Sequence, residues 1–397
     1  MKLSDYKNIK YINTQISDFC KIRNGYSFKS NLYSKSGIRV IRISDVQKGS
    51  ISDNDIVFYP LNLKNEFENY LLTEKDILVS LTGNVGRVAM LKISNLPAAL
   101  NQRVAAISTN SNVINKYLYY CISNDTFENQ CYEASTGGAQ KNLSTKWLAN
   151  YVVPIPEIKV QEEIVKILDS FTNLIDALNE ELSLRQKQLE YYRDQLYDDL
   201  FKQTKGVDVL CFSELGHIER GKRFVRDDIK SHGQPCIHYG DMYTFYGVKS
   251  NKAKTYLDRD FPKKMRYADI GDVIIVGAGE NNWDIGVGLA WLGEEPAAVH
   301  DACYIVKHNN NPLFIAYYTR TTEYHQQLKK CVSEGKICSF SAEGLGKVTI
   351  PVPSLAIQQS IVEKLDAFES LISLLKEEIA LRQKQYEYYR EKLLTFD

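Results

Sequence analysis

The sequence predicts an α/β (α+β) protein with a pseudo-two-fold internal repeat. Two domains stand in tandem, joined by two long helices that form an antiparallel coiled coil. Residues 154–197 return as residues 351–394, shifted by 197 positions, with about half of the residues identical. Both copies carry a heptad pattern, and short β-branched runs lie outside them. Solenoid repeats reach only about 50 residues, so this period indicates two whole modules.

The first domain is expected at residues 1–153. Runs such as 40–45 and 76–80 are short, rich in β-branched residues and bounded by polar or glycine positions, which is typical of strands. Residues 114–122 fit a helix. We therefore expect a mixed domain of strands and short helices.

A helical spacer is expected next, at residues 154–200. From Ile164 to Leu196 the apolar positions advance by alternating steps of four and three, which sustains a heptad seam for more than four heptads. Pro154 and Pro156 precede the helix, where proline is tolerated. The residues expected to pair the helices, in the two copies, are Leu168, Phe171, Ile175, Leu178, Leu365, Phe368, Ile372 and Leu375.

The second domain (201–350) and a C-terminal helical spacer (351–397) complete the chain. The second domain resembles the first only weakly, and a helix is expected at 313–328. It connects the end of one long helix to the start of the other. Domain termini usually lie close together, so the two helices are expected to run antiparallel. Arg185 and Arg382 interrupt the seam; they either fix its register or extend past it to solvent.

The net charge of zero conceals an uneven distribution. Residues 1–150 carry 18 basic and 12 acidic side chains, whereas residues 151–200 carry 5 basic and 11 acidic ones. The corresponding counts are 20 and 18 for residues 201–350, and 6 and 8 for residues 351–397. The charge therefore permits a polyanion at the globular parts and disfavours one along the acidic helices. A solvated surface of mixed charge fits the same counts.

Motifs of catalysis and metal binding are missing from the sequence. It has no Walker A motif, no Asn-Pro-Pro-Tyr type methylation motif, no HExxH and no CxxC pair. We therefore expect no catalytic residues, no metal site and no cofactor of its own. Eight scattered cysteines, no apolar stretch of 18 residues and no signal-peptide pattern favour the reducing cytoplasm over a membrane.

The order of short motifs, present in two copies, resembles the specificity (S) subunit of a type I restriction–modification system. Gly25 and Gly221 begin the pattern in the two domains. The second domain departs from it at residues 277–286 and 334–338. In the first domain the pattern continues through Ile43-Ser44-Asp45, Asp76, Leu81–Gly86, Asn101-Gln102-Arg103, Ser135–Leu143, Val153–Pro156 and Gln161–Val165.

This resemblance implies a non-catalytic protein that recognises DNA. Each globular domain would read one half of a bipartite double-stranded target, and the helical pair would set the spacing. Two methylation subunits, which use S-adenosylmethionine, would dock on the helices. Restriction subunits, which use ATP and Mg²⁺, would join the complex. A specificity subunit of a related methylation–cleavage system outside type I, or a protein–protein adaptor, fits the same layout.

Base edges and phosphates are recognised by Arg, Lys, Asn, Gln and similar side chains, and glycine turns let the backbone approach a phosphate. On that basis the candidate DNA-binding residues of the first domain are Arg42, Asn84, Arg87, Arg103, Gly137, Gly138, Gln140, Lys141 and Asn142. Those of the second domain are Arg223, Arg226, His238, Asn281, Asn282, Lys336 and Ser339. A surface polar residue or a simple turn is the alternative at each position.

Overall fold

The computed structural model describes residues 9–74, 76–110, 112–138, 141–203, 205–261, 264–279, 285–333, 335 and 337–396. The chain divides into two compact units. The first unit is Met1–Ala177 with Ile379–Asp397, and the second is Leu178–Glu378. The division falls within two long helices, α5 (Ile158–Lys202) and α11 (Leu355–Leu394). The domain limits expected from the sequence therefore stay predictions.

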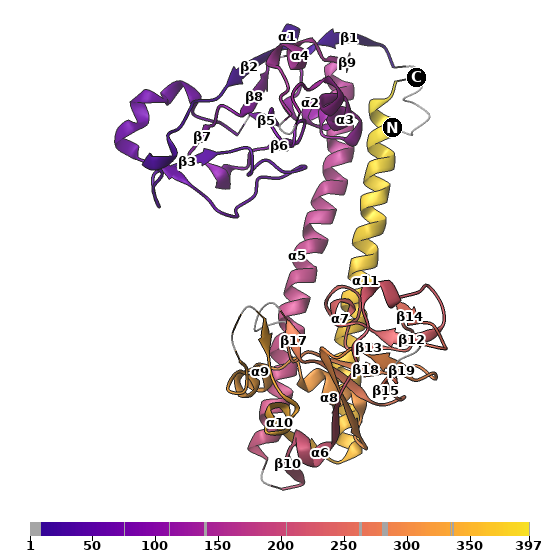
Figure 1. Cartoon of the computed structure of the whole chain (residues 1–397). Helices are drawn as coiled ribbons and strands as arrows, with labels where there is room; N and C mark the ends of the chain where they lie inside the picture. The colour runs from indigo at the N-terminus through magenta and orange to yellow at the C-terminus, as the bar shows by residue number, and fades with distance from the viewer. Residues whose placement is uncertain are drawn as a thin grey trace. The chain divides into compact units, whose positions relative to one another are not determined.

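In the first unit, a two-stranded ladder pairs β1 with β9. A four-stranded sheet has the order β2-β8-β5-β6, and a three-stranded sheet the order β4-β3-β7. Its strands are β1 (Tyr11–Gln15), β2 (Cys20–Asn24), β3 (Ile38–Ile41), β4 (Phe58–Tyr59), β5 (Ile77–Ser80), β6 (Val88–Met90), β7 (Ala98–Leu100), β8 (Val104–Thr109) and β9 (Val152–Pro156). Its short helices are α1 (Ile16–Phe19), α2 (Asn115–Ile122), α3 (Asp125–Ala134) and α4 (Thr145–Asn150), with 3₁₀ turns at Ser30–Leu32, Leu61–Glu66, Glu68–Tyr70 and Ile93–Asn95. Helices α2 and α3 lie beside the start of α5 (Figure 1).

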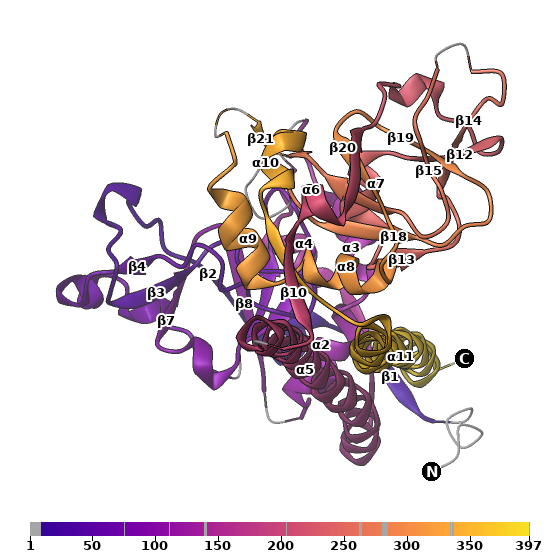
Figure 2. The ribbon, with the colours of Figure 1, turned by 90° about the horizontal axis from the view of Figure 1, so that it is seen from below.

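The second unit repeats this plan with additional strands. Its ladder is β10-β22, its larger sheets are β11-β20-β16-β18-β13 and β14-β12-β19-β15, and β17 pairs with β21. The strands are β10 (Val207–Cys211), β11 (Gly216–Arg220), β12 (Gln234–Ile237), β13 (Lys249–Ser250), β14 (Thr255–Leu257), β15 (Tyr267–Ala268), β16 (Val273–Val276), β17 (Ala278–Gly279), β18 (Gly288–Trp291), β19 (Ala297–Val299), β20 (Cys303–His308), β21 (Cys338–Ser339) and β22 (Thr349–Pro353). The short helices are α6 (Phe212–Leu215), α7 (Tyr239–Thr244), α8 (Pro312–Tyr318), α9 (Thr322–Lys329) and α10 (Ala342–Gly346), with a 3₁₀ turn at Arg226–Asp228. Helix α8 lies beside α11 (Figure 2).

In each unit an aromatic stack joins the two long helices. In the first unit Phe171 of α5 stacks on Tyr389 of α11, with ring centroids 5.1 Å apart. In the second unit Tyr192 of α5 stacks on Phe368 of α11 at 5.6 Å. Adding 197 to Phe171 and Tyr192 gives Phe368 and Tyr389, so the two stacks are copies. Each joins an early residue of one helix to a late residue of the other, which makes the pairing antiparallel.

The other residues expected at the helix seam lie in the same interface or along the same face. Leu168 is buried in a cluster that also contains Leu393, and Leu365 and Ile372 are buried in a cluster with Leu189. Ile175, Leu178 and Leu375 are half-buried. Arg185 bonds Glu181 and Gln188 of its own helix, so its contacts follow the helix surface.

A buried glutamine anchors the start of each long helix. The Oε1 atom of Gln161 accepts a hydrogen bond from the Ile114 amide at 2.9 Å, and its Nε2 donates to the Pro156 carbonyl at 2.9 Å. Gln358 makes the equivalent bonds with Asn311 and Pro353, also at 2.9 Å. The duplicated amide therefore joins each domain to its helix by satisfying backbone groups that burial would otherwise leave unpaired.

The single helix expected at residues 313–328 is wrong. Residues 313–328 form two helices, α8 and α9, with a break between them. The side chain of Thr321 accepts a hydrogen bond from the Tyr324 amide and so caps the start of α9. An N-cap residue has non-helical backbone angles, and a continuous helix cannot pass through it.

Candidate nucleic-acid interface

Three loops of the first unit converge at the ends of β5, β7 and α3. The Leu81 amide donates to the Arg103 carbonyl at 3.0 Å, and the Leu143 amide donates to the Leu81 carbonyl at 2.8 Å. The Gly83 amide donates to the Lys141 carbonyl at 2.9 Å. Backbone bonds therefore fix loop 81–87, loop 101–103 and residues 135–138 and 141–143 of a third loop against one another. We call this the first-domain loop cluster.

The cluster brings together most of the candidate residues of the first domain. Asn84, Arg103 and Asn142 are exposed. The Asn142 side-chain oxygen accepts a hydrogen bond from the Thr82 hydroxyl at 3.0 Å, which holds that amide in place. The Lys141 ammonium lies 4.9 Å from the centre of the Tyr132 ring, a cation–π contact that orients a half-buried lysine.

The glycines form an open tip of the same cluster. Gly137 has a φ of 101°, a region that side chains rarely adopt. At Gly138 no atom lies within 4 Å of where a Cβ would be. The backbone here is strained for other residues at one position and accessible at the next. This suits a close approach to a phosphate oxygen.

Arg42 and Arg87 differ from the rest because they are bound within the domain. The Arg42 guanidinium contacts Asp45 at 3.4 Å and Asp55 at 3.1 Å. Arg87 donates to the side-chain oxygen of Gln47 at 2.7 Å. These partners neutralise one arginine and orient the other, so neither offers an unpaired guanidinium as the sequence suggested.

In the second unit, three candidates gather around the end of β12. Arg223 and Arg226 are exposed, and within the described residues neither forms an ion pair. Arg226 lies close enough to His238 to disfavour the charged form of that imidazole, and Arg223 does the same to His300. Burial is the largest cause of the lowered pKa of both histidines.

Two further residues belong to this group but were not singled out from the sequence. Phe224 lies between the arginines and packs on His238 and His300, with ring centroids 6.0 and 5.0 Å away. His300 occupies the position of Asn101 in the repeated Pro-Ala-Ala motif. The repeated motif could have identified His300 as a candidate residue, but it could not show which rings His300 contacts.

The remaining candidates of the second domain divide into two sets. Ser339 lies in β21 and pairs with Ala278 of β17, next to the Phe340 amide that donates to the Gly277 carbonyl. It therefore occupies the place that Asn142 has in the first domain. The other set, Asn281, Asn282 and Lys336, lies outside the described residues, as does Gln140 of the first domain.

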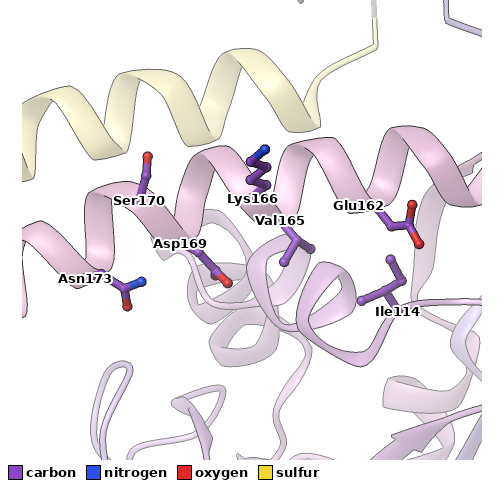
Figure 3. Close-up of a pocket in the computed structure, with 7 residues that line it drawn as sticks. All are labelled: Ile114, Glu162, Val165, Lys166, Asp169, Ser170 and Asn173. Atoms are coloured by element: carbon purple, nitrogen blue, oxygen red, sulfur yellow. The ribbon is translucent and has the colours of Figure 1, made fainter.

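The first unit also has a shallow groove of about 540 Å³ on one face of α5. Figure 3 shows Val165, Asp169 and Asn173 along this face, with Ile114 opposite the start of the helix. Asp169 accepts hydrogen bonds from the Tyr120 hydroxyl at 2.5 Å and from the Lys116 ammonium at 2.8 Å. The carboxylate is therefore already satisfied, and the groove offers an apolar surface rather than a cation site.

A second feature of the long helices is a duplicated set of exposed apolar side chains. Leu184 and Leu381 are 59% and 56% exposed, and Tyr191 and Tyr388 are 60% and 53% exposed. The leucine and tyrosine of each helix are seven residues apart, on one helix face. Near-equal exposure at equivalent positions gives both helices the same surface.

Among the described residues, no group of three or more His, Cys, Asp or Glu side chains is arranged to hold a metal ion. Of the helices in that part of the chain, none combines the length and apolar character needed to cross a bilayer.

Known proteins resemble the chain over nearly its whole length. A family model described as the type I restriction modification DNA specificity domain matches residues 8–185 and again residues 204–382. A putative type I restriction enzyme specificity subunit of Haemophilus influenzae is 28% identical over 366 residues, covering 87% of this chain and 89% of that protein. The specificity subunit of the type I restriction enzyme EcoR124I/EcoR124II from Escherichia coli is 29% identical over 313 residues, covering 71% and 70%.

Solved structures show the same fold. The crystal structure of the S subunit of a type I restriction–modification system from M. genitalium has a TM-score of 0.56 at 13% identity, over 98% of this chain and 97% of that one. A chain from a study of complex assembly and conformational transition of the type I R-M system has a TM-score of 0.59 at 14% identity, over 98% of both chains.

Proposed function

The chain belongs to the family of type I restriction–modification DNA specificity subunits, and from this premise we propose that each of its globular domains reads one half of a bipartite DNA target. The first half-site would contact the first-domain loop cluster. The second would contact the surface around Arg223, Arg226 and His238. The specificity subunit would thus select the DNA on which the assembled system acts.

One observation carries this proposal. The frame of the protein is duplicated in detail, whereas the side chains at the loop ends are not. The Tyr120–Asp169 hydrogen bond recurs as Tyr317–Asp366, at 2.5 and 2.7 Å. At the end of β3, by contrast, Arg42 is paired with carboxylates, and the matching position after β12 is His238. Such a molecule holds two different recognition surfaces on one scaffold.

We place the docking of two methylation subunits on the exposed leucine and tyrosine of each long helix. Because the same surface occurs twice, it suits two copies of one partner rather than two different partners. Exposed apolar side chains of this kind mark interaction sites when they gather on one face. Restriction subunits would join through that complex.

The docking proposal has a direct test. Leu184→Glu and Leu381→Glu each place a charge in one copy of the surface, which is unfavourable in an apolar interface. Native mass spectrometry of the purified complex should show one methylation subunit with either single variant and none with the double variant. Glu190→Gln, an exposed change on α5, is the control. Two subunits bound to the double variant would contradict the assignment.

We propose that the chain contributes no chemistry of its own. S-adenosylmethionine, ATP and Mg²⁺ would be bound by the partner subunits, and the protein would act in the cytoplasm, where the DNA is. The eight cysteines are free, as expected in a reducing compartment.

The function is tested by profiling adenine methylation across the host genome with and without this chain. A two-part methylated motif should disappear when the chain is deleted and return with the intact gene. A chimera with the second domain of a relative should change only one half of the motif. An unchanged methylation profile after deletion would refute the function and favour a protein–protein adaptor.

A further inference from the structure

His238 stands at the end of β12 and caps the start of α7. Its Nδ1 atom accepts a hydrogen bond from the Gly240 amide at 3.2 Å. A neutral imidazole has one N–H, so a ring that accepts at Nδ1 carries its hydrogen on Nε2. The backbone thereby fixes the tautomer and makes Nε2 a hydrogen-bond donor.

The ring is also fixed in orientation. Tyr239, His300 and Phe224 surround it, with ring centroids 4.6, 4.7 and 6.0 Å away. His300 is held in the same manner, because its Nδ1 accepts from the Ala302 amide at 3.1 Å. Burial lowers the pKa of His238, which keeps the ring neutral near pH 7.

The donor atom of this half-buried residue is neither fully buried nor already used within the described residues. Within the described residues, His238 Nε2 forms no hydrogen bond, and it is not among the fully buried atoms that lack a partner. Arg226 lies close enough to the His238 ring, and Arg223 to the neighbouring His300 ring, to disfavour their charged forms. Both arginines are exposed and suited to phosphates. A directed neutral donor near exposed cations suits base readout, since phosphate contacts position a protein and base contacts specify the sequence.

The first domain does not repeat this arrangement. At the matching position, the Arg42 guanidinium is occupied by Asp45 and Asp55. The end of this strand therefore presents an ion-paired cation in the first domain and a neutral imidazole in the second.

We infer that His238 reads a purine in the second half-site, by donating from Nε2 to the purine N7 in the major groove. N7 is the major-groove acceptor that adenine and guanine share, and its removal in a 7-deaza purine distinguishes it from the other acceptors, guanine O6 and thymine O4. His300 and Phe224 act as positioning residues. The inference rests on the proposed DNA-reading function of the second domain.

The test uses the complex of the full chain with its methylation subunits and a set of DNA duplexes. In each duplex one purine of the second half-site is replaced by its 7-deaza analogue, which lacks the N7 acceptor. One replacement should weaken wild-type binding about two- to tenfold, the loss expected for one neutral hydrogen bond.

Two variants assign this effect to His238. In His238→Asn the side-chain oxygen can still accept from the Gly240 amide, but no donor reaches the position of Nε2. This variant should bind the normal and 7-deaza duplexes equally. In His238→Gln the amide reaches that position, so sensitivity to 7-deaza replacement should remain. His232→Asn, an exposed change in the same unit, is the control and should behave as wild type.

The outcomes separate this inference from the function on which it rests. If no 7-deaza replacement in the second half-site affects the wild type, the inference is overturned without any variant. It is also overturned if His238→Asn, folded by circular dichroism, stays as sensitive as wild type. If the wild-type complex binds no two-part site, the proposed function itself fails.

Discussion

Acid should destabilise the second unit, and one half-buried histidine, His308, should make a measurable share of that loss. All six histidines lie between residues 217 and 325, within that unit. His308, the last residue of β20, accepts a hydrogen bond from the Asn310 amide at Nδ1, and its Nε2 is buried without a partner among the described residues. Burial lowers the pKa of His308 from 6.5 to about 4.

Stability falls in acid because the unfolded chain takes up a proton on His308 at a higher pH than the folded chain does. Above pH 6.5 the ring is neutral in both states, so it costs no stability. As the pH falls through 6.5 the unfolded chain binds a proton that the folded chain refuses until about pH 4. Between pH 7 and pH 5 this difference removes about 2 kcal/mol of unfolding free energy, at 1.36 kcal/mol for each unit of pKa difference.

The measurement is urea unfolding at pH 7 and pH 5, followed by circular dichroism, for wild type and His308→Asn. Asparagine can keep the bond to the Asn310 amide but does not titrate. Any loss of packing is the same at both pH values and cancels. The variant should therefore lose about 2 kcal/mol less than wild type between pH 7 and pH 5. An equal loss in both proteins would refute the reasoning.

Three further predictions concern the interface and the frame. Lys141→Ala should weaken discrimination at the first half-site only, measured from the methylated motif; equal loss at both half-sites, or at neither, would contradict its place in the loop cluster. Deleting four residues within Leu178–Leu189 should change the spacer length accepted between half-sites, measured by methylation of sites with varied gaps; an unchanged spacer would reject the helices as a ruler. Gln358→Leu should cost about 2–6 kcal/mol of unfolding free energy, because two buried backbone partners lose their bonds at about 1–3 kcal/mol each. Gln186→Leu, at an exposed site, should cost less than about 0.5 kcal/mol.

Much of the frame follows from the sequence because its determinants are local. Helix pairing depends on apolar residues at steps of three and four, and these steps are visible without any tertiary information. The stacks of Phe171 on Tyr389 and of Phe368 on Tyr192 join residues of the expected seam. The antiparallel direction followed from the position of the second domain between the two helices.

The sequence predicted the recognition surface less completely than the helical frame. The sequence placed Asn84, Lys141 and Asn142 among the candidates, and the structure brings their loops together through backbone bonds between residues about 60 positions apart. The structure also shows that Arg42 is paired with a carboxylate. Asp55 lies 13 positions away in the sequence, and the fold of the loop after β3 brings it to Arg42.

The sequence by itself determined the duplication, the two long helices, their direction and the uneven charge. Only the tertiary structure decided which cations are neutralised, which loops meet and which nitrogen of His238 carries the hydrogen. The physical reason is range. Helical periodicity is fixed by neighbours within two turns, whereas the meeting of the loops and the pairing of Arg42 with Asp55 depend on atoms that the fold brings together. The tautomer of His238 depends on the backbone conformation at the end of β12, which turns the Gly240 amide toward Nδ1.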